Sequence, residues 1–362
     1  MPDAATLEAA RADLLKHARL KLVYSGGDFA FTDWTGAELA GAVIRATSFH
    51  AARFDGARLT DVTFIDCDLS GAVFRGGHLE NVTVMASNLA DAHLEQAALA
   101  GLSATKCALP RAHLQSAALT ECAFLSCDLS QANLSGARLY RCALLDCTLE
   151  GIDLSHVQAA RLAITKADLR SATLQGLRCE TALLAEADLS GLDLTSLSLA
   201  RSNLMGANLT GANLSGMTLD GAFLMGCAAE GADFSGISGH AVHFAESDLV
   251  GANFAGAKLG AANFREARLA GADFSAADLE RAVMTGARAP EARFVEANLT
   301  YAQLAHARLD GADASRARFK RTDLHVALTS GFVRAGASGD TLDTDPIKDR
   351  AERYVPPAGA RS

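Results

Sequence analysis

Two histidines are the residues of this chain whose types and spacing come closest to a chemical site. His93 and His113 lie twenty residues apart, and a pair of imidazoles at a fixed spacing could bind a metal ion. The same spacing supplies no third ligand, since the next positions in either direction are Val73 and Asn133. We therefore expect a structural or surface role for both histidines and no metal site.

Catalytic motifs do not occur in the sequence. It contains no phosphate-binding loop, no Gly-x-Ser-x-Gly elbow and no His-Glu-x-x-His pair. The outward residues of a regular repeat form flat walls, whereas catalysis needs a concave pocket. We therefore expect no enzymatic activity and no cofactor.

A repeat of five residues determines the secondary structure that holds these side chains in place. Leu or Phe recurs at nearly every fifth position in one register from Phe29 to Leu324, usually with a small residue two places earlier, as in Ala207-Asn208-Leu209. This period fits neither a helix nor an ordinary strand. A chain that turns a corner every five residues would close a square coil of twenty, with two side chains of each unit pointing inward. Such coils must stack to bury a core, which predicts a solenoid.

The repeat Ala-Asp/Asn-Leu/Phe-x-x resembles that of the pentapeptide repeat family, and residues 207–216 match it residue for residue. The resemblance covers roughly residues 24–328. It implies an all-β solenoid, a right-handed quadrilateral β-helix of about 15 coils. We expect an N-terminal capping helix at 1–22, the pentapeptide-repeat β-helix at 23–329, and a linker with an irregular C-terminal tail at 330–362.

Both ends of the chain depart from the repeat. Residues 3–20 show helical spacing of apolar residues, and an amphipathic helix there would cover the open first coil. Residues 335–340 are small and predict a flexible linker. Asp345 followed by Pro346 predicts the start of a short helix that would run through Tyr354. This tail either caps the last coil or binds another molecule, and the sequence favours neither.

The eight cysteines occupy inward positions of the repeat. Each is expected to pack as a slightly larger alanine. Cys122 and Cys142 are twenty residues apart, as are Cys127 and Cys147, so each pair would lie on neighbouring coils at about 4.8 Å. That distance permits a disulfide. We expect reduced thiols instead, because the chain has no export leader or twenty-residue apolar run and is interpreted as a cytoplasmic protein without membrane association.

One wall of the predicted solenoid is uncharged. The positions directly before and after the central residue, taken every twenty residues from Thr63 to Ala245, include no charged residue when His is neutral. Exposed apolar patches of this kind usually mark an interface. A general preference of β walls for Thr, Met and Leu, or cover by the chain's own ends, would explain the same pattern. The candidate interface residues on this apolar wall are Ile65, Met85, Leu125, Leu145, Leu183, Met205, Phe223 and Met225.

Charge supplies a second candidate surface. The chain has 42 acidic and 33 basic residues and a net charge of −9. An acidic wall is formed by Asp128, Asp168, Asp188 and Asp248. The following positions at the same spacing of twenty residues are basic, namely Arg268, Arg288 and Arg308. A DNA mimic should be negative along its whole contact face, so the change of sign weakens that interpretation. The basic end is short and lacks interleaved aromatic residues, so direct nucleic-acid binding is not expected.

These features favour a non-catalytic protein of bacterial type, a rigid rod that acts as a scaffold or adaptor through the apolar wall. Its partner would be another protein, and a homodimer is one form of such pairing. Two alternatives rest on the family resemblance. One is a DNA-mimicking inhibitor or protector of DNA gyrase or topoisomerase IV, which would use the acidic wall. The other is an accessory protein of a bacterial secretion system.

Overall fold

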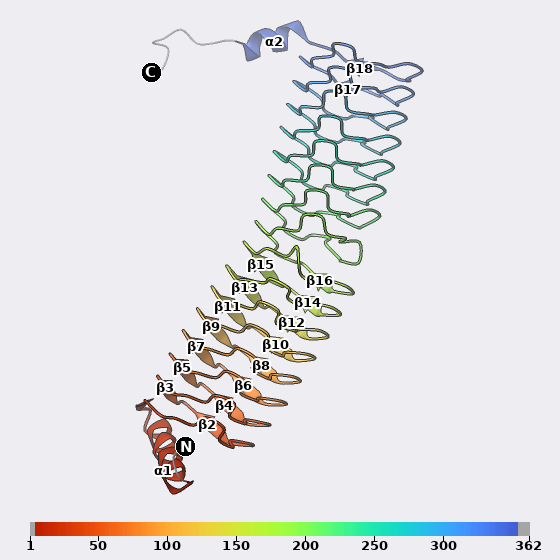
Figure 1. The fold of residues 1–362 in the computed structure, drawn as a ribbon. Coiled ribbons are helices and arrows are strands. Elements are labelled where there is room, and N and C mark those ends of the chain that lie inside the picture. Colours follow the sequence, from red (N-terminus) through yellow and green to blue (C-terminus); the bar gives the residue numbers. More distant parts are fainter. Residues whose placement is uncertain (1–3, 354–362) are drawn as a thin grey trace, which may run out of the picture. The chain divides into compact units, whose positions relative to one another are not determined.

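The computed structural model describes residues 4–353 of the chain, and most of them form stacked parallel coils of twenty residues (Figure 1). The chain divides into two compact units. The first contains the residues up to Asp188 together with Ser196–Ser198, and the second contains Leu189–Thr195 together with the residues from Leu199 onward. Each unit is a parallel β-solenoid, which confirms the predicted fold class.

Two parallel sheets of three-residue strands run through the first unit. Neighbouring strands are twenty residues apart, as where Ala123 pairs with Ala143. The first sheet contains β1 (Val23–Ser25), β3 (Val43–Arg45), β5 (Thr63–Ile65), β7 (Thr83–Met85), β9 (Ser103–Thr105), β11 (Ala123–Leu125), β13 (Ala143–Leu145) and β15 (Ala163–Thr165). The second contains β2 (Glu38–Ala40), β4 (Arg58–Thr60), β6 (His78–Glu80), β8 (Ala98–Ala100), β10 (Ala118–Thr120), β12 (Arg138–Tyr140), β14 (Gln158–Ala160) and β16 (Arg178–Glu180).

Single β-bridges complete the coils. In the first unit they form two further ladders, which begin with Asp28 paired to Ser48 and Asp33 paired to Arg53. The chain turns the corners between ladders with residues of positive φ, such as Gly71 at 63°. Glycine adopts this left-handed conformation without the steric cost that other residues carry, which accounts for its frequency at the corners.

The core consists of the inward Leu, Phe and Ala side chains that the five-residue period predicts. In the second unit, Phe254 has no exposed surface and stacks between Phe234 and Phe274, with ring centroids 4.9 Å and 4.8 Å away. Phe244 and Phe264 meet the same ring edge to face. The large side chains therefore form continuous columns inside the coils, and none of these five aromatic residues is available at the surface.

All eight cysteines are buried and free. The Sγ atom of Cys122 donates a hydrogen bond to the carbonyl of Leu99 at 3.4 Å, and that of Cys142 donates to the carbonyl of Leu119 at 3.4 Å. The cysteines therefore pack as reduced thiols, as expected.

The buried thiols should be unreactive in the folded protein. Burial keeps a reagent away from all eight thiols, and at Cys227 it also raises the pKa to about 11, which disfavours the nucleophilic thiolate there. We expect a thiol-specific disulfide reagent to modify none of the eight cysteines in native buffer and all of them in denaturant, measured by absorbance. Because the folded pKa is raised, this group stabilises the fold less as the pH rises from its ordinary pKa toward 11. Rapid modification of the native protein would contradict this assignment.

Helix α1 (Ala4–Arg19) packs against β1 and β2 at the start of the first unit (Figure 1). Leu14 is fully buried, the guanidinium of Arg11 lies 4.6 Å from the ring centroid of Trp34, and it donates to the carbonyl of Asp33. The helix thus covers the first coil, as its spacing predicts. No helix among residues 4–353 is long and apolar enough to cross a membrane.

The coil pairing continues beyond the expected boundary at residue 329. Val333 is bridged to Asp313 and Ser338 to Arg318. Strand β18 (Thr341–Leu342) then pairs with β17 (Thr322–Asp323). The stretch expected to be a linker is therefore the last coil. The physical reason is that backbone groups alone form the ladder, so small residues continue it even after the Leu and Phe pattern ends.

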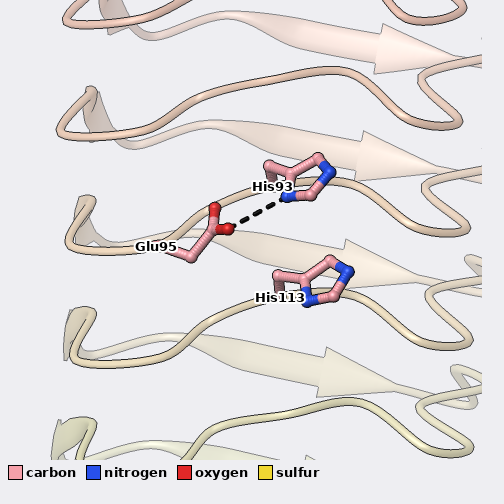
Figure 2. A group of neighbouring side chains, drawn as sticks. All are labelled: His93, Glu95 and His113. Carbon is pink, nitrogen blue, oxygen red and sulfur yellow. Dashed lines mark hydrogen bonds and ion pairs between the residues drawn. The ribbon is translucent and has the colours of Figure 1, made fainter.

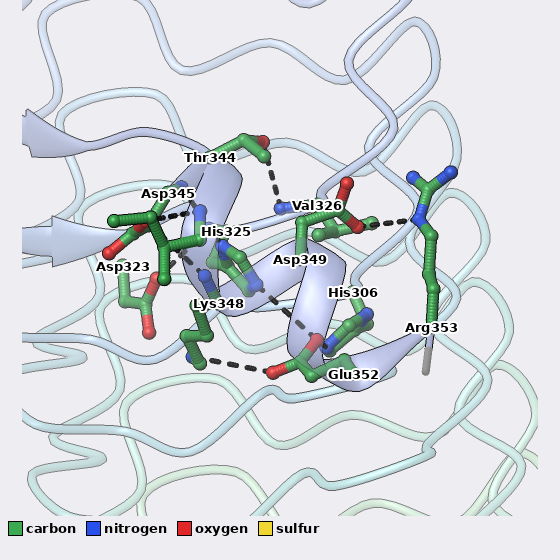
Figure 3. Close-up of polar contacts among 11 residues, drawn as sticks. His306, Asp323, His325, Val326, Thr344, Asp345, Lys348, Asp349, Glu352 and Arg353 are labelled. Atoms are coloured by element: carbon green, nitrogen blue, oxygen red, sulfur yellow. Dashed lines mark hydrogen bonds and ion pairs between the residues drawn. The ribbon is translucent and has the colours of Figure 1, made fainter. Parts of the chain in front are cut away.

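Helix α2 (Pro346–Glu352) begins where Asp345-Pro346 predicts it. The Asp345 carboxylate caps it by accepting hydrogen bonds from the first backbone N–H groups. Tyr354, the predicted end, lies outside the described residues. The helix has no buried residue, and polar contacts hold it to the last coils (Figure 3). The Glu352 carboxylate lies 3.1 Å from His306 Nε2 and 3.3 Å from His325 Nε2.

Candidate interaction surface

The apolar wall of the first unit is the outer face of strands β5, β7, β9, β11, β13 and β15. In each strand the middle residue points into the core and the two flanking residues face outward. The outward residues are Thr63, Ile65, Thr83, Met85, Ser103, Thr105, Ala123, Leu125, Ala143, Leu145, Ala163 and Thr165, none of them charged. Met85 and Leu125 are 43% and 44% exposed. Five strand spacings make this surface about 24 Å long.

The second sheet of the same unit is a natural comparison, since its strands have the same length and the same twenty-residue register. In its matching strands, β4 to β14, the outward positions include three charged residues, Arg58, Glu80 and Arg138, together with His78. A general preference of β walls for apolar residues would act on both sheets alike. The absence of charge from β5 to β15 therefore needs a reason specific to that wall.

Charged residues border the apolar wall at its corners. One corner carries Asp61, Glu121, Arg141 and Arg161. The other carries Asp66, Lys106, Asp146 and Lys166. An uncharged centre with a polar rim is the usual anatomy of a protein–protein interface.

The predicted interface residues fall in both units. In the first unit Leu183 extends the wall, since it is bridged to Ala163 and is 36% exposed. In the second unit Met205, Phe223 and Met225 are 41%, 48% and 41% exposed. The structure brings together the candidates within each unit.

The acidic wall is less charged than its sequence suggests. Three of its four residues, Asp128, Asp168 and Asp188, belong to the first unit, and Asp248 belongs to the second. The side chain of Arg170 bonds both oxygens of the Asp168 carboxylate and lowers the pKa of Asp168 to about 2. The same guanidinium lies 3.5 Å from Asp188. Asp248 is paired with Arg268. Two arginines therefore offset half of the negative charge of these four carboxylates.

A histidine cluster lies on another ladder of the first unit (Figure 2). The rings of His93 and His113 stack with their centroids 4.5 Å apart, and His93 Nδ1 lies 3.0 Å from Glu95 Oε1. Burial raises the pKa of Glu95, but hydrogen bonds from His93 and Arg75 outweigh it and lower the pKa below its ordinary value. Sequence reasoning missed Glu95, because a search at a spacing of twenty overlooks a ligand two residues along the same coil.

Models of known protein families match repeats in both units of the chain. One family model described as pentapeptide repeats matches residues 119–156, 164–196, 198–238, 247–288 and 291–325. A second model of the same description matches residues 29–73. No curated protein shows significant sequence similarity to the chain.

Solved structures with similar repeats share little sequence with this chain. The plasmid-mediated fluoroquinolone resistance protein QnrB1 is 19% identical, over 56% of this chain and 88% of its own, with a TM-score of 0.35. HetL, a pentapeptide repeat protein of the cyanobacterium Nostoc involved in heterocyst differentiation regulation, is 23% identical over 72% and 86%, with a TM-score of 0.19. Likeness at this level says nothing about what this chain binds.

Proposed function

The chain belongs to the pentapeptide repeat family, and we propose that it acts without catalysis, as a cytoplasmic scaffold or adaptor of bacterial type that binds another protein through the apolar wall. A regular solenoid presents flat walls on a rigid body, and its function depends on which residues each wall carries. The partner is a folded protein, or a second copy of this chain.

One observation carries the proposal: strands of equal length and register in the two sheets of the first unit differ in the charge of their outward residues. The outer face of β5 to β15 has no charged residue, whereas the outer face of the second sheet includes Arg58, Glu80, Arg138 and Arg178. Exposed Met and Leu side chains bury apolar area against a partner, and the flexible Met side chain adapts to the shape of the partner's surface. A row of uncharged residues also avoids the cost of removing charges from water.

The size of the apolar wall limits how the partner binds. Strands of three residues are about 10 Å long, so the uncharged centre covers about 240 Å². A stable interface buries about 800 Å² on each partner. The partner must therefore extend beyond the strands onto the charged corners. Those corner charges would set the orientation and specificity of binding, and the apolar centre would supply most of the affinity.

The acidic wall gives weaker support to the alternative of a topoisomerase partner. Asp168 and Asp188 share the guanidinium of Arg170, and Asp248 is paired with Arg268. Duplex DNA carries one unneutralised phosphate charge per about 1.7 Å of its axis. Because three of the four carboxylates of the acidic wall are already paired with an arginine, this wall carries a weaker negative field than DNA does.

Charging the apolar wall should abolish capture of the partner. We expect Leu125→Glu combined with Leu145→Glu to reduce recovery of the partner at least hundredfold, because burying two carboxylates costs several kcal/mol. The measurement is affinity purification from cells of the native source with quantitative mass spectrometry.

The matched control is Thr120→Glu combined with Tyr140→Glu. Thr120 and Tyr140 pair with each other in the second sheet, just as Leu125 and Leu145 pair in the first. The two pairs lie in the same two coils. Both variants therefore place two like charges opposite each other and carry the same cost to the fold. Equal recovery of the partner with both variants would refute the proposal, and a topoisomerase recovered equally with both would support the acidic wall instead.

A further inference from the structure

The histidine cluster of the first unit contains acceptors that its own donors do not satisfy. Glu95 Oε2 and Gln115 Oε1 are buried and have no hydrogen-bond partner among residues 4–353. His93 Nδ1 lies 3.0 Å from Glu95 Oε1 and 3.2 Å from Arg75 Nη2. That nitrogen must carry a proton to donate to the carboxylate and must lack one to accept from the guanidinium. With its proton on Nδ1, His93 donates to Glu95 and cannot accept from Arg75, which is left with its bond to Glu95 Oε1 at 3.3 Å.

We propose that His93, Glu95 and His113 bind a divalent transition-metal ion, and that Zn²⁺ fits best (Figure 2). One ligand atom from each residue lies within 4.8 Å of the others. Two imidazole nitrogens and one carboxylate oxygen are donors that Zn²⁺ prefers, and water completes the coordination. Within the described part of the chain, the one hydrogen bond at His113 Nδ1 comes from Gln115, at the long distance of 3.5 Å, so this lone pair is readily available.

Metal binding requires small side-chain movements. The two imidazole rings are stacked within 5° of parallel, and parallel rings cannot both direct their lone pairs at one ion between them. The ligand atoms around a tetrahedral Zn²⁺ lie about 3.4 Å apart, given a Zn–N distance of about 2.1 Å. Both rings must therefore rotate. The His93 side chain is 29% exposed, so it has room to do so.

Arg75 competes with the metal ion for the same atoms. Its Nη2 atom lies 3.3 Å from Glu95 Oε1 and 3.2 Å from His93 Nδ1. The Arg75 side chain is 54% exposed and extends from the preceding coil, so it can withdraw into solvent. Removing this guanidinium should therefore strengthen metal binding, whereas a purely structural cluster would only lose a contact.

The second histidine cluster is the internal comparison (Figure 3). His306, His325 and Glu352 also place ligand atoms within 4.8 Å. There, however, His325 Nδ1 accepts the backbone N–H of Asp345 at 3.2 Å, so the proton lies on Nε2, which donates to Glu352. A metal ion at Nε2 would have to move that proton to Nδ1 and break the bond to Asp345. This cluster is a satisfied structural contact that holds α2.

The test is calorimetric titration of ZnCl₂ into the full-length, reduced protein in a buffer that does not chelate metals. We expect one Zn²⁺ ion per chain with micromolar affinity. His113→Gln, at a partly exposed position, should weaken binding at least tenfold, and Arg75→Gln should tighten it. His306→Gln, in the second cluster, should leave the affinity unchanged.

Thermal unfolding followed by circular dichroism provides the second readout. Zn²⁺ should raise the melting temperature of the wild-type protein and of His306→Gln, and should not raise that of His113→Gln. The melting curve without metal also shows whether each variant is folded. Absence of Zn²⁺ binding by the wild-type protein, or equal affinity in folded His113→Gln, would overturn the proposal.

Discussion

Replacing Phe254 with alanine is expected to lower the free energy of unfolding by about 3–5 kcal/mol. The ring is fully buried, is stacked between Phe234 and Phe274, and is met edge to face by Phe244 and Phe264. Alanine at this position leaves a cavity bounded by four aromatic rings, and stacked coils cannot collapse into it without breaking ladder hydrogen bonds. Urea unfolding followed by circular dichroism measures the change.

Phe223→Ala is the matched control in the same unit. Its side chain is 48% exposed and stacks on His243 at the surface. The expected cost of this change is about 0.5 kcal/mol or less. Similar losses in the two variants would contradict the assignment of Phe254 to the core and Phe223 to the surface.

Trp34→Ala should have an effect of similar size in the first unit, about 3–5 kcal/mol. Trp34 is fully buried and stacks on Phe54 with a centroid distance of 5.8 Å. Its indole N–H donates to Thr32, and Arg11 of α1 lies over its ring. Loss of the indole therefore removes both core packing and one of the contacts that hold α1. Urea unfolding measures the first effect, and faster hydrogen exchange of the α1 amides measures the second.

Phe31→Ala is the control for this change, because Phe31 lies in the same coil and is 62% exposed. Its ring contacts only His50 edge to face among the aromatic contacts of the described residues. We expect a loss of about 0.5 kcal/mol or less and no change in α1 exchange. Faster exchange of α1 in this variant would show that the cap depends on exposed rather than buried contacts.

The sequence predicted the solenoid well because one rule repeats along it. The Leu or Phe at every fifth position must point inward, so the strand register, the burial pattern and the twenty-residue spacing between coils all follow from the period. The burial of the cysteines followed from the same rule, because each occupies an inward position of the repeat. The start of α2 was predictable because Asp345 and Pro346 carry a local signal that depends on no distant contact.

The division into two units was not predicted from the sequence. Between Thr173 and Asn203, Leu192 and Leu197 occupy the small inward position while the central position keeps its own leucine. Two large inward side chains in one repeat also occur at Ile152 with Leu154, within the regular coils of the first unit, so this pattern alone does not mark the division. The five-residue period records only the spacing of the inward residues and not their volume, so it gave no indication of a division at this point.

The polar contacts of the candidate sites were the least predictable part. The pairing of Arg170 with Asp168, and the contact of Glu95 with His93, join residues only two apart that could equally have pointed into solvent. Which way such side chains turn depends on the coils above and below, as with Arg75 over Glu95. The apolar wall was easier to locate, because absence of charge can be read from spacing alone.

Photo-cross-linking tests the central claim, binding through the apolar wall, most directly. A photoreactive amino acid replaces Leu125 in one preparation and Thr120, on the second sheet of the same coil, in another, and the cells are irradiated. A covalent adduct from position 125 and none from position 120 is the predicted result, and its mass separates a foreign protein from a second copy of this chain. Equal adducts from both positions, or adducts from position 120 alone, would contradict the account.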